Sequence, residues 1–504
     1  MKSSDSCIKV LFDNKAVYAK HGSLLSEVIS GEKPCGGHGK CGKCKVKVIG
    51  EVSPLSKAEK NHLTETEISQ GVRLACLTKI LGECRVERIT TAASVNVLTE
   101  ASGRDINIAP TFNDLGVAVD IGTTTVAARL YNTRGQLLSE ASCLNPQTEI
   151  GADVVSRIEA SLKGDREKLG LMIVKAVDGI LCELARKADV LSSRIDRAVI
   201  TGNTVMLSLL TKESVEPFSH APFRAERLFG ETLNAGELGI SSISPDARIY
   251  LPSCISAFVG ADTVCAILFS GMLDEKSALL ADIGTNGEMA LYQDGRLTVA
   301  STAAGPAFEG VGISMGMRGG FGAIDRVFVE DKKLKAHTVG DTVPVGICGS
   351  GLVDVAACML EVGIIDSDGY LDDTFTVEGG VSVTEGDIRQ LQLAKSAISA
   401  GILTLFEERK RGKDFDGNFY VAGGFGNYLN VDNAIKIGLI PRRTAGHTKT
   451  VGNAALGGAS MMLLDKELAD KDKDVASVAE LIELSGNPDF SERFILGMTF
   501  EEVE

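Results

Sequence analysis

A repeated strand-and-turn motif constrains the fold of this chain more than any other feature of its sequence. The stretch 115–138 reads LGVAVDIGTTTVAARLYNTRGQLL, and the stretch 278–299 reads ALLADIGTNGEMALYQDGRLTV. In both copies an apolar strand ends in Asp-Ile-Gly-Thr, apolar residues resume, a Tyr follows, and the chain turns at Asn or Asp and Gly. Internal similarity of this kind indicates duplication. The sequence therefore predicts two β-hairpins, each of which opens one half of a duplicated domain.

The residue types in the repeat suit a phosphate group and a cation. A glycine after a strand lets backbone N–H groups approach an anion without a Cβ in the way, and threonine hydroxyls add donors. An aspartate at a strand end can hold Mg²⁺ through water. We therefore predict catalytic roles for Asp120 and Asp282. The predicted nucleotide contacts are Gly122, Thr123, Thr124, Gly284, Thr285 and Asn286. Ordinary hairpin turns are the alternative, and two matched copies argue against it.

A third motif completes the pattern. The stretch 420–429, YVAGGFGNYL, predicts a strand, a Gly-Gly turn and then a helix. Gly423 and Gly424 would let the main chain lie flat against a purine and a ribose. Two phosphate hairpins followed by this element resemble the sugar kinase, Hsp70 and actin superfamily, which implies an ATP site between two lobes. The stretch 451–463, VGNAALGGASMML, is predicted to be a helix whose small residues permit a close crossing.

Four cysteines near the N-terminus have the spacing of an iron–sulfur site. Cys35, Cys41 and Cys44 lie on a glycine- and lysine-rich stretch, and Cys76 follows in RLACLT. Plant-type ferredoxins hold [2Fe–2S] with a C-x4-C-x2-C loop and a distant fourth Cys, and this x5 variant resembles the adrenodoxin-like branch. Zinc is the rival ligand, but zinc sites pair C-x2-4-C knuckles. We therefore predict these four cysteines as [2Fe–2S] ligands.

Charge and hydropathy narrow the partners and the compartment. The net charge of −15 argues against nucleic acid as the main partner. No run reaches the roughly 18 apolar residues of a membrane span, and the first residues lack a signal-peptide core. We therefore expect a cytoplasmic protein with reduced thiols. Residues 1–94 hold 15 Lys/Arg against 10 Asp/Glu, with lysines crowded around the cysteine loop, which suggests an acidic partner. These lysines are Lys33, Lys40, Lys43, Lys45 and Lys47.

These patterns divide the chain into four parts. We expect a ferredoxin-like domain over 1–90, a linker over 91–113, an ATP-binding domain over 114–464 and a C-terminal tail over 465–504. The two lobes of the ATP-binding domain are expected at about 114–275 and 276–464. The fold class is then multidomain, α+β and α/β, with an N-terminal β-grasp [2Fe–2S] domain before a duplicated RNase H-like ATPase domain.

Taken together, the motifs resemble the reductive activators of corrinoid-dependent enzymes. The resemblance rests on the cysteine loop with RLACLT, DIGTTTVAARL, LNPQTEIGADVVSRI, TGNTVM, DIGTNGEMAL, AGPAFEG, GICGSGLVD and VAGGFGNYL in this order. It implies a [2Fe–2S] cluster, ATP and Mg²⁺ as cofactors, and ATP-dependent reduction of Co(II) to Co(I) in a corrinoid protein. It also implies an upstream low-potential electron donor and allows a homodimer. The alternatives are an ATP-driven electron injector for another acceptor, such as a 2-hydroxyacyl-CoA dehydratase, and an ATP-binding redox sensor.

Overall fold

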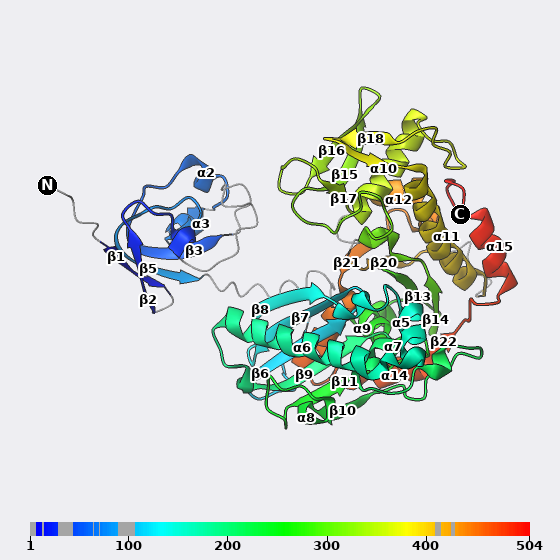
Figure 1. Ribbon diagram of the computed structural model, residues 1–504, viewed down its shortest axis with the longest axis horizontal. Helices are drawn as coiled ribbons and strands as arrows, with labels where there is room; N and C mark the ends of the chain where they lie inside the picture. Colours follow the sequence, from blue (N-terminus) through cyan, green and yellow to red (C-terminus); the bar gives the residue numbers. More distant parts are fainter. Residues whose placement is uncertain are drawn as a thin grey trace. The chain divides into compact units, whose positions relative to one another are not determined.

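The chain folds into two compact units. The computed structural model describes residues 7–12, 15–28, 44–63, 65–69, 71–88, 106–408, 415–424 and 429–503. The first unit is Met1–Thr91 and the second is Ala92–Glu504 (Figure 1).

The first unit is built on one five-stranded mixed sheet in the order β2-β1-β5-β3-β4. Strand β1 is parallel to β5, and the other neighbouring pairs are antiparallel. Apolar side chains such as Val10, Val48 and Val86 alternate onto one face and pack with Leu25 of α1. This is the β-grasp arrangement predicted from the sequence. Its elements are β1 Cys7–Phe12, β2 Lys15–Lys20, α1 Leu25–Val28, β3 Lys45–Val52, α2 Lys57–Lys60, α3 Glu65–Ser69, β4 Val72–Leu74 and β5 Ile80–Arg88.

The second unit contains two six-stranded sheets that share a plan of five strands and differ in the edge that carries the sixth, which confirms the predicted duplication. In the first sheet the order is β10-β11-β9-β6-β7-β8, and in the second it is β21-β20-β12-β13-β14-β22. Each opens with three antiparallel strands, and the first of these lies parallel to a later strand. The matched tyrosines also share a register, because Tyr131 lies opposite Gly116 and Tyr292 lies opposite Ala278.

The strands of the first sheet are β6 Leu115–Ile121, β7 Thr125–Asn132, β8 Leu137–Leu144, β9 Ile195–Gly202, β10 Glu231–Asn234 and β11 Arg248–Leu251. Those of the second are β12 Ser277–Ile283, β13 Asn286–Gln293, β14 Arg296–Ala303, β20 Asn418–Ala422, β21 Thr448–Gly452 and β22 Ala479–Leu481. Smaller sheets are formed by β15 Ala323–Glu330, β16 Lys333–Thr338 and β17 Gly346–Ile347, and by β18 Phe375–Glu378 and β19 Val381–Val383.

Two helices join the sheets through a shared core. Helices α9 (Ala261–Ser270) and α13 (Ala454–Leu464) pack against each other, and their apolar residues form one buried cluster with residues from both sheets. The contact is close because a Cβ on Gly458 would lie 2.0 Å from the carbonyl oxygen of Cys265. The helix predicted over 451–463 is therefore real, but its start is wrong. Residues Thr448–Gly452 form strand β21, which pairs in parallel with β20 and so extends the sheet. The helix begins only at Ala454.

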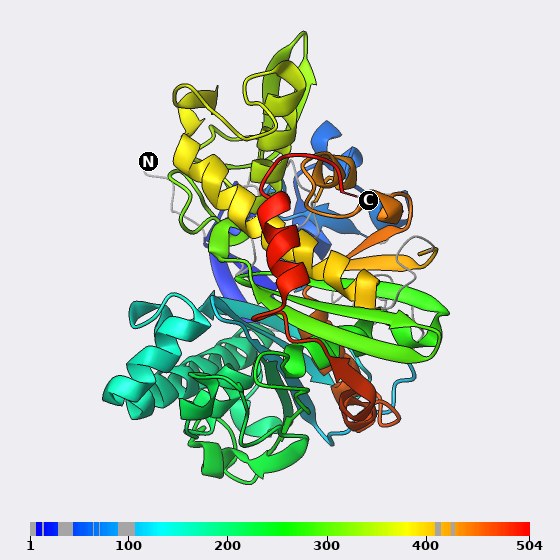
Figure 2. The same ribbon diagram turned by 90° about the vertical axis from the view of Figure 1, so that its right-hand side faces the viewer.

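Other helices cover the outer faces of the sheets. Helix α6 packs on β7 and β8 in the first half, and α10 packs on β15 in the second. Helix α15 crosses α11, as Figure 2 shows in red and yellow. The helices are α5 Val154–Ala160, α6 Arg166–Ala188, α7 Thr204–Leu210, α8 Ala235–Leu238, α9 Ala261–Ser270, α10 Gly349–Val362, α11 Glu385–Glu408, α12 Val431–Lys436, α13 Ala454–Leu464, α14 Lys471–Val478 and α15 Pro488–Leu496.

The segments on either side of the two sheets are packed against them. Phe112, within the predicted linker, is buried under Gly116, and Ala109 forms a parallel bridge with Asp465. Beyond residue 465, β22 adds to the second sheet beside β14. Within the described part of the chain, none of the helices combines the length and apolar character needed to cross a bilayer.

Candidate functional site

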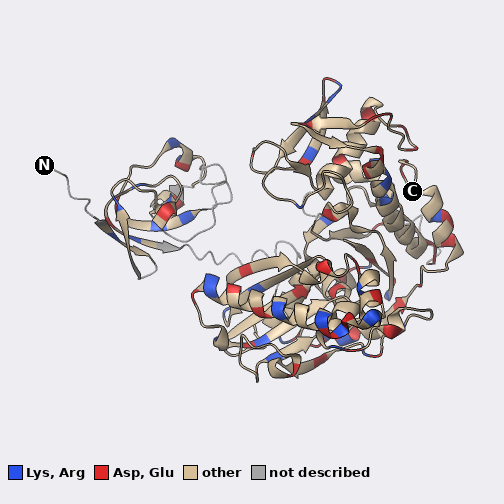
Figure 3. Ribbon diagram, viewed as in Figure 1, with Lys and Arg blue, Asp and Glu red and all other residues tan. Residues whose placement is uncertain are grey.

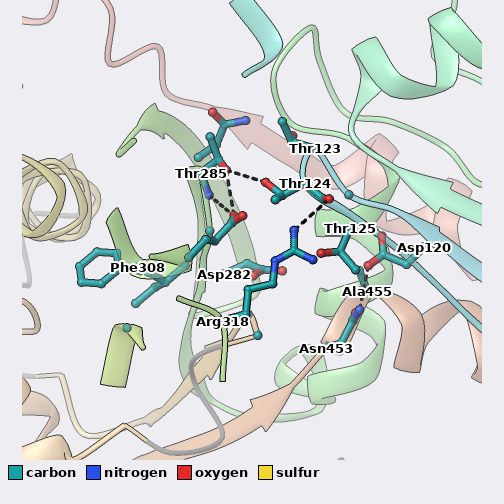
Figure 4. Close-up of a pocket in the computed structure, with 18 of the residues that line it drawn as sticks. Asp120, Thr123, Thr124, Thr125, Asp282, Thr285, Phe308, Arg318, Asn453 and Ala455 are labelled. Carbon is teal, nitrogen blue, oxygen red and sulfur yellow. Dashed lines mark hydrogen bonds between the residues drawn. The ribbon is translucent and has the colours of Figure 1, made fainter. Parts of the chain in front are cut away.

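A cavity of about 410 Å³ lies where the two repeated hairpins meet. Its lining includes every residue that the sequence predicts for the nucleotide and its cation (Figure 4). These are Asp120, Gly122, Thr123, Thr124, Asp282, Gly284, Thr285, Asn286, Gly423 and Gly424. Segments far apart in the sequence therefore converge on one site.

The first hairpin turn is held from behind by buried polar side chains. The guanidinium of Arg157 donates to the carbonyl oxygens of Thr123, at 2.5 Å, and Gly151, at 3.0 Å. The amide of Asn145 donates to the carbonyl oxygen of Gly122 at 2.9 Å. Burial lowers the pKa of Arg157 to about 10, so it remains charged at neutral pH. These bonds occupy the carbonyl groups of the turn on the protein side, which reduces their repulsion of an anion in the cavity.

The second hairpin turn is bonded to a carboxylate. The backbone N–H and the hydroxyl of Thr285 both donate to Oε1 of Glu309, at 2.9 and 2.8 Å. The hydroxyl oxygens of Thr285 and Thr124 lie 3.4 Å apart, so the two turns touch across the cleft (Figure 4). Glu309 belongs to the glycine-rich stretch 302–319, which the sequence alone left open as either a lining of the nucleotide cleft or a partner surface. A phosphate bound here would accept hydrogen bonds from the two Thr285 donors that now bind Glu309.

The third motif supplies a surface without side chains at the cavity wall. Gly423 has a φ of +104°, and a Cβ there would lie 2.3 Å from the carbonyl oxygen of Ile283. Glycine is therefore required at this position. A Cβ on Gly424 would meet no atom within 4 Å, so open space lies beside the main chain. Residues 425–428 of the motif lie outside the described residues, and α12 begins at Val431.

Carboxylates from both sheets gather in the cavity, and the sequence analysis missed two of them. Asp262 is the second residue of α9, and Gly260, which caps this helix, packs against the backbone of Asn203. Glu288 lies directly opposite Asp282 in the β12–β13 pair. Like charges directly opposite each other destabilise a strand pair. The pairing of Glu288 with Asp282 in the hairpin is therefore the sequence signal that could have identified Glu288 as a site residue. A single Asp in the first turn of an apolar helix gave no comparable signal for Asp262.

Burial raises the pKa of these carboxyl groups. For Asp120 the pKa rises to about 7, because burial outweighs a hydrogen bond from Asn453 at 2.8 Å, and Asp262 adds to the rise. For Asp282 the pKa rises to about 8 through burial and the nearby charges of Asp262 and Asp120. A divalent cation would relieve this repulsion. Within the described residues, no set of three His, Cys, Asp or Glu side chains is placed to ligate a metal directly.

These raised pKa values predict how stability depends on pH. Because the folded pKa of Asp282 lies above its ordinary 3.8, the folded state binds more protons than the unfolded state between about pH 4 and 8. This carboxyl therefore lowers stability as pH rises through that window. In the presence of a chelator, we expect Asp282→Asn to melt a few degrees above the natural chain at pH 8.5 and at the same temperature at pH 4.5. Calorimetry tests this, and a gap independent of pH would contradict it.

In the first unit, two of the four predicted cluster ligands can be placed. The sulfur atoms of Cys44 and Cys76 lie 3.2 Å apart, close enough to share one iron. Backbone bonding holds the pair, since the N–H of Ala75 donates to the carbonyl oxygen of Cys44 at 2.9 Å. Cys35 and Cys41 lie outside the described residues. The chemistry of the described donors fits a thiolate-held cluster.

A buried carboxylate braces the loop that carries Cys76. Glu59 accepts hydrogen bonds from Arg73 at 2.9 Å, from the N–H of Leu74 at 3.2 Å and from the hydroxyl of Thr78 at 3.2 Å. Burial works against its charge, but the Arg73 bond and the backbone donors outweigh it and lower the pKa of Glu59 to about 2. It therefore stays ionised and fixes both ends of the loop.

Known families match three consecutive parts of the chain. A 2Fe-2S iron-sulfur cluster binding domain matches residues 23–81, a RACo middle region matches 115–275, and the C-terminal domain of RACo, the ASKHA domain, matches 276–504. Fold and matches together define the class, which is an iron–sulfur domain joined to a two-lobed ASKHA unit.

Similar proteins narrow the class to a family. The corrinoid activation enzyme RamQ of Eubacterium limosum is 34% identical over 76% of this chain and 70% of its own. The Co(II) methylated amine-specific corrinoid protein reductase of Methanosarcina barkeri is 26% identical over 73% and 72%. A solved structure described as a reductive activator for corrinoid, iron-sulfur protein covers 98% of both chains at 28% identity, with a TM-score of 0.72. This chain belongs to the RACo family of reductive activators of corrinoid proteins.

Proposed function

We propose that this chain uses ATP to drive reduction of Co(II) to Co(I) in a corrinoid protein. One observation carries the proposal: a predicted cluster site and a phosphate-type cavity occur in one chain whose relatives are a corrinoid activation enzyme and a corrinoid protein reductase. When bound, the [2Fe–2S] cluster supplies a one-electron carrier. A step uphill by about 120 mV costs about 3 kcal/mol, which differential binding of nucleotide states can supply.

The residues of the cavity divide the work between the lobes 114–275 and 276–464. We propose that Asp120 and Asp282 hold the water shell of Mg²⁺ from opposite sides. The hairpin turns, with Gly122, Thr123, Thr124, Gly284, Thr285 and Asn286, would bind the phosphates, and Gly423 with Gly424 would face the purine and ribose. Support comes from their convergence on one cavity and from the carboxylate repulsion that a cation would relieve.

The corrinoid partner would dock on the basic face of the ferredoxin-like domain. Lys47 is exposed on β3, which supports this proposal. Figure 3 shows the Lys and Arg positions of this domain in blue and its Asp and Glu positions in red. Lys45 instead pairs with Glu67 at 2.7 Å, so its charge is already partly compensated. Lys33, Lys40 and Lys43 lie outside the described residues. An upstream low-potential donor would refill the cluster, and a homodimer is compatible with the proposal. A cysteine pattern that favours a metal cluster over disulfides supports a cytoplasmic location.

The test is reduction of a purified corrinoid protein by the pre-reduced chain, with and without Mg²⁺–ATP. We expect the optical spectrum of Co(I) to develop only with the nucleotide, and ADP not to replace ATP. Reduction at the same rate without nucleotide would contradict the coupling. No reduction, together with ATP-dependent binding, would favour a redox sensor. Reduction of a different low-potential acceptor but not of the corrinoid would favour the electron-injector alternative.

A further inference from the structure

One basic side chain reaches into a cavity otherwise rich in carboxylates. Arg318 lines the cavity and is the one Lys or Arg among the described residues that do so. Figure 4 shows its side chain extending toward the turn that contains Thr124 and Thr125. The carboxylates of the same lining are Asp120, Asp262, Asp282, Glu288 and Glu309.

The loop that carries Arg318 has a fixed shape. Gly310 has a φ of +79°, and a Cβ there would lie 2.6 Å from the backbone nitrogen of Met317. A Cβ on Gly316 would lie 2.1 Å from the carbonyl oxygen of Gly310. The loop therefore folds back on itself, backbone against backbone. The N–H of Met317 also donates to the carbonyl oxygen of Ile347 at 2.9 Å, which ties the loop to β17 just before Arg318.

The Arg318 guanidinium connects the two halves of the unit through a hydrogen bond to a neutral acceptor. Its terminal nitrogen donates to the carbonyl oxygen of Thr124 at 3.2 Å, from the second half to the first hairpin turn. A backbone carbonyl is a neutral acceptor, whereas a phosphate oxygen is charged and can accept two parallel bonds from the planar guanidinium. Arg318 is exposed, so a nucleotide entering the cavity can reach it. The present contact is one that a phosphate would readily replace.

We propose that Arg318 is a catalytic residue that binds the terminal phosphate of ATP and stabilises the charge that develops there during hydrolysis. The proposal rests on the proposed ATP site. In the reaction, the oxygen of a water molecule bonds to the terminal phosphorus. The bond from that phosphorus to the bridging oxygen breaks, and the bridging oxygen keeps the electron pair on ADP. Inorganic phosphate and a proton are the other products.

Charge balance explains why the reaction needs this residue. Mg²⁺ would be shared between the carboxylates and the phosphates, so its charge is largely neutralised by the protein. Negative charge on the equatorial oxygens of the transferring group then needs a separate positive donor, which positioned guanidinium groups supply in other phosphoryl-transfer sites. Arg318 is the described basic group that already lies in the cavity.

The test compares Arg318→Ala and Arg318→Lys with Arg326→Ala as a matched control. Arg326 lies on β15 with a side chain 59% exposed, and it does not line the cavity. We expect Arg318→Ala to lower kcat for ATP hydrolysis by about 100-fold or more, with ADP affinity within about two-fold of the natural chain, because ADP lacks the terminal phosphate. Arg318→Lys should recover only part of kcat, since it keeps the charge but not the planar fork. The control should hydrolyse ATP normally.

ADP binding with aluminium fluoride, a mimic of the transferring group, separates contact from structure. We expect Arg318→Ala to lose the added affinity that fluoride gives the natural chain, while binding ADP alone as before. A kcat within about three-fold of the natural value, or unchanged fluoride-dependent affinity, would overturn the assignment of Arg318 while the ATP site stands. If the natural chain neither binds nor hydrolyses ATP, the proposed function fails, and the role of Arg318 fails with it.

Discussion

Replacing Cys76 with alanine should yield a protein that holds no [2Fe–2S] cluster and reduces no corrinoid cobalt. Cys76 is only 3% exposed, and its sulfur lies 3.2 Å from that of Cys44. A buried methyl group cannot replace a thiolate, and the cluster needs all four ligands. We expect iron to fall from about two atoms per chain to near zero, with loss of the EPR signal of the reduced protein. ATP hydrolysis should persist, because the cavity belongs to the other unit.

Cys84 provides a matched control for this experiment. It is also buried, on β5 in the same unit, and burial raises the pKa of its thiol, which disfavours the thiolate form needed by a ligand. Cys84→Ala should therefore keep its iron and its visible spectrum. A Cys76→Ala protein with full iron content and an unaltered spectrum would show that the ligand assignment is wrong.

Replacing Asp282 with alanine should remove ATP hydrolysis while leaving the cluster intact. Of the two predicted catalytic residues, Asp282 has the larger rise in pKa. Burial and the charges of Asp262 and Asp120 raise its pKa to about 8. This energetic cost is the kind expected where a cation is to be held. We expect kcat to fall by about 10³-fold or more and Mg²⁺-dependent nucleotide affinity to fall with it.

Asp331→Asn is the control for this variant. Asp331 is exposed in the turn between β15 and β16, with a φ of 50° that asparagine tolerates. The Asp331→Asn protein should hydrolyse ATP at the natural rate. The visible spectrum of the cluster should be the same in both variants. Full hydrolysis by Asp282→Ala, measured with saturating Mg²⁺, would remove Asp282 from the catalytic machinery.

Much of this architecture could be predicted because the duplication repeats both chemistry and strand pattern. Two copies of Asp-Ile-Gly-Thr fixed the hairpins, and chain order alone suggested that Gly423 and Gly424 would join them. Local pattern also predicts a strand before a Gly-Gly turn. Fold class and family followed from these motifs, and the structure and the relatives confirm both.

What escaped prediction depends on tertiary contacts. Asp262 reaches the cavity because Gly260 packs on a turn that is distant in sequence, and nothing near Asp262 reports that packing. The donor from Arg318 crosses to the opposite half, where sequence offers no distance information. The start of α13 was misplaced because apolar residues suit a buried strand and a buried helix equally well. In each case the contact that determines the local structure is made with a residue far away in the sequence.

The crossing of α9 and α13 limits how the two halves can move. The two helix backbones are in contact at Gly458 and Cys265, inside a core to which both sheets contribute side chains. Wide separation would expose that core to water at a cost proportional to its apolar area, whereas sliding of packed helices exposes little. Since Asn453, which caps α13, donates to Asp120, a cation at Asp120 acts directly on the sliding element. Nucleotide exchange should therefore produce a shear of small amplitude about this pivot, with larger displacements only at the rims of the cleft.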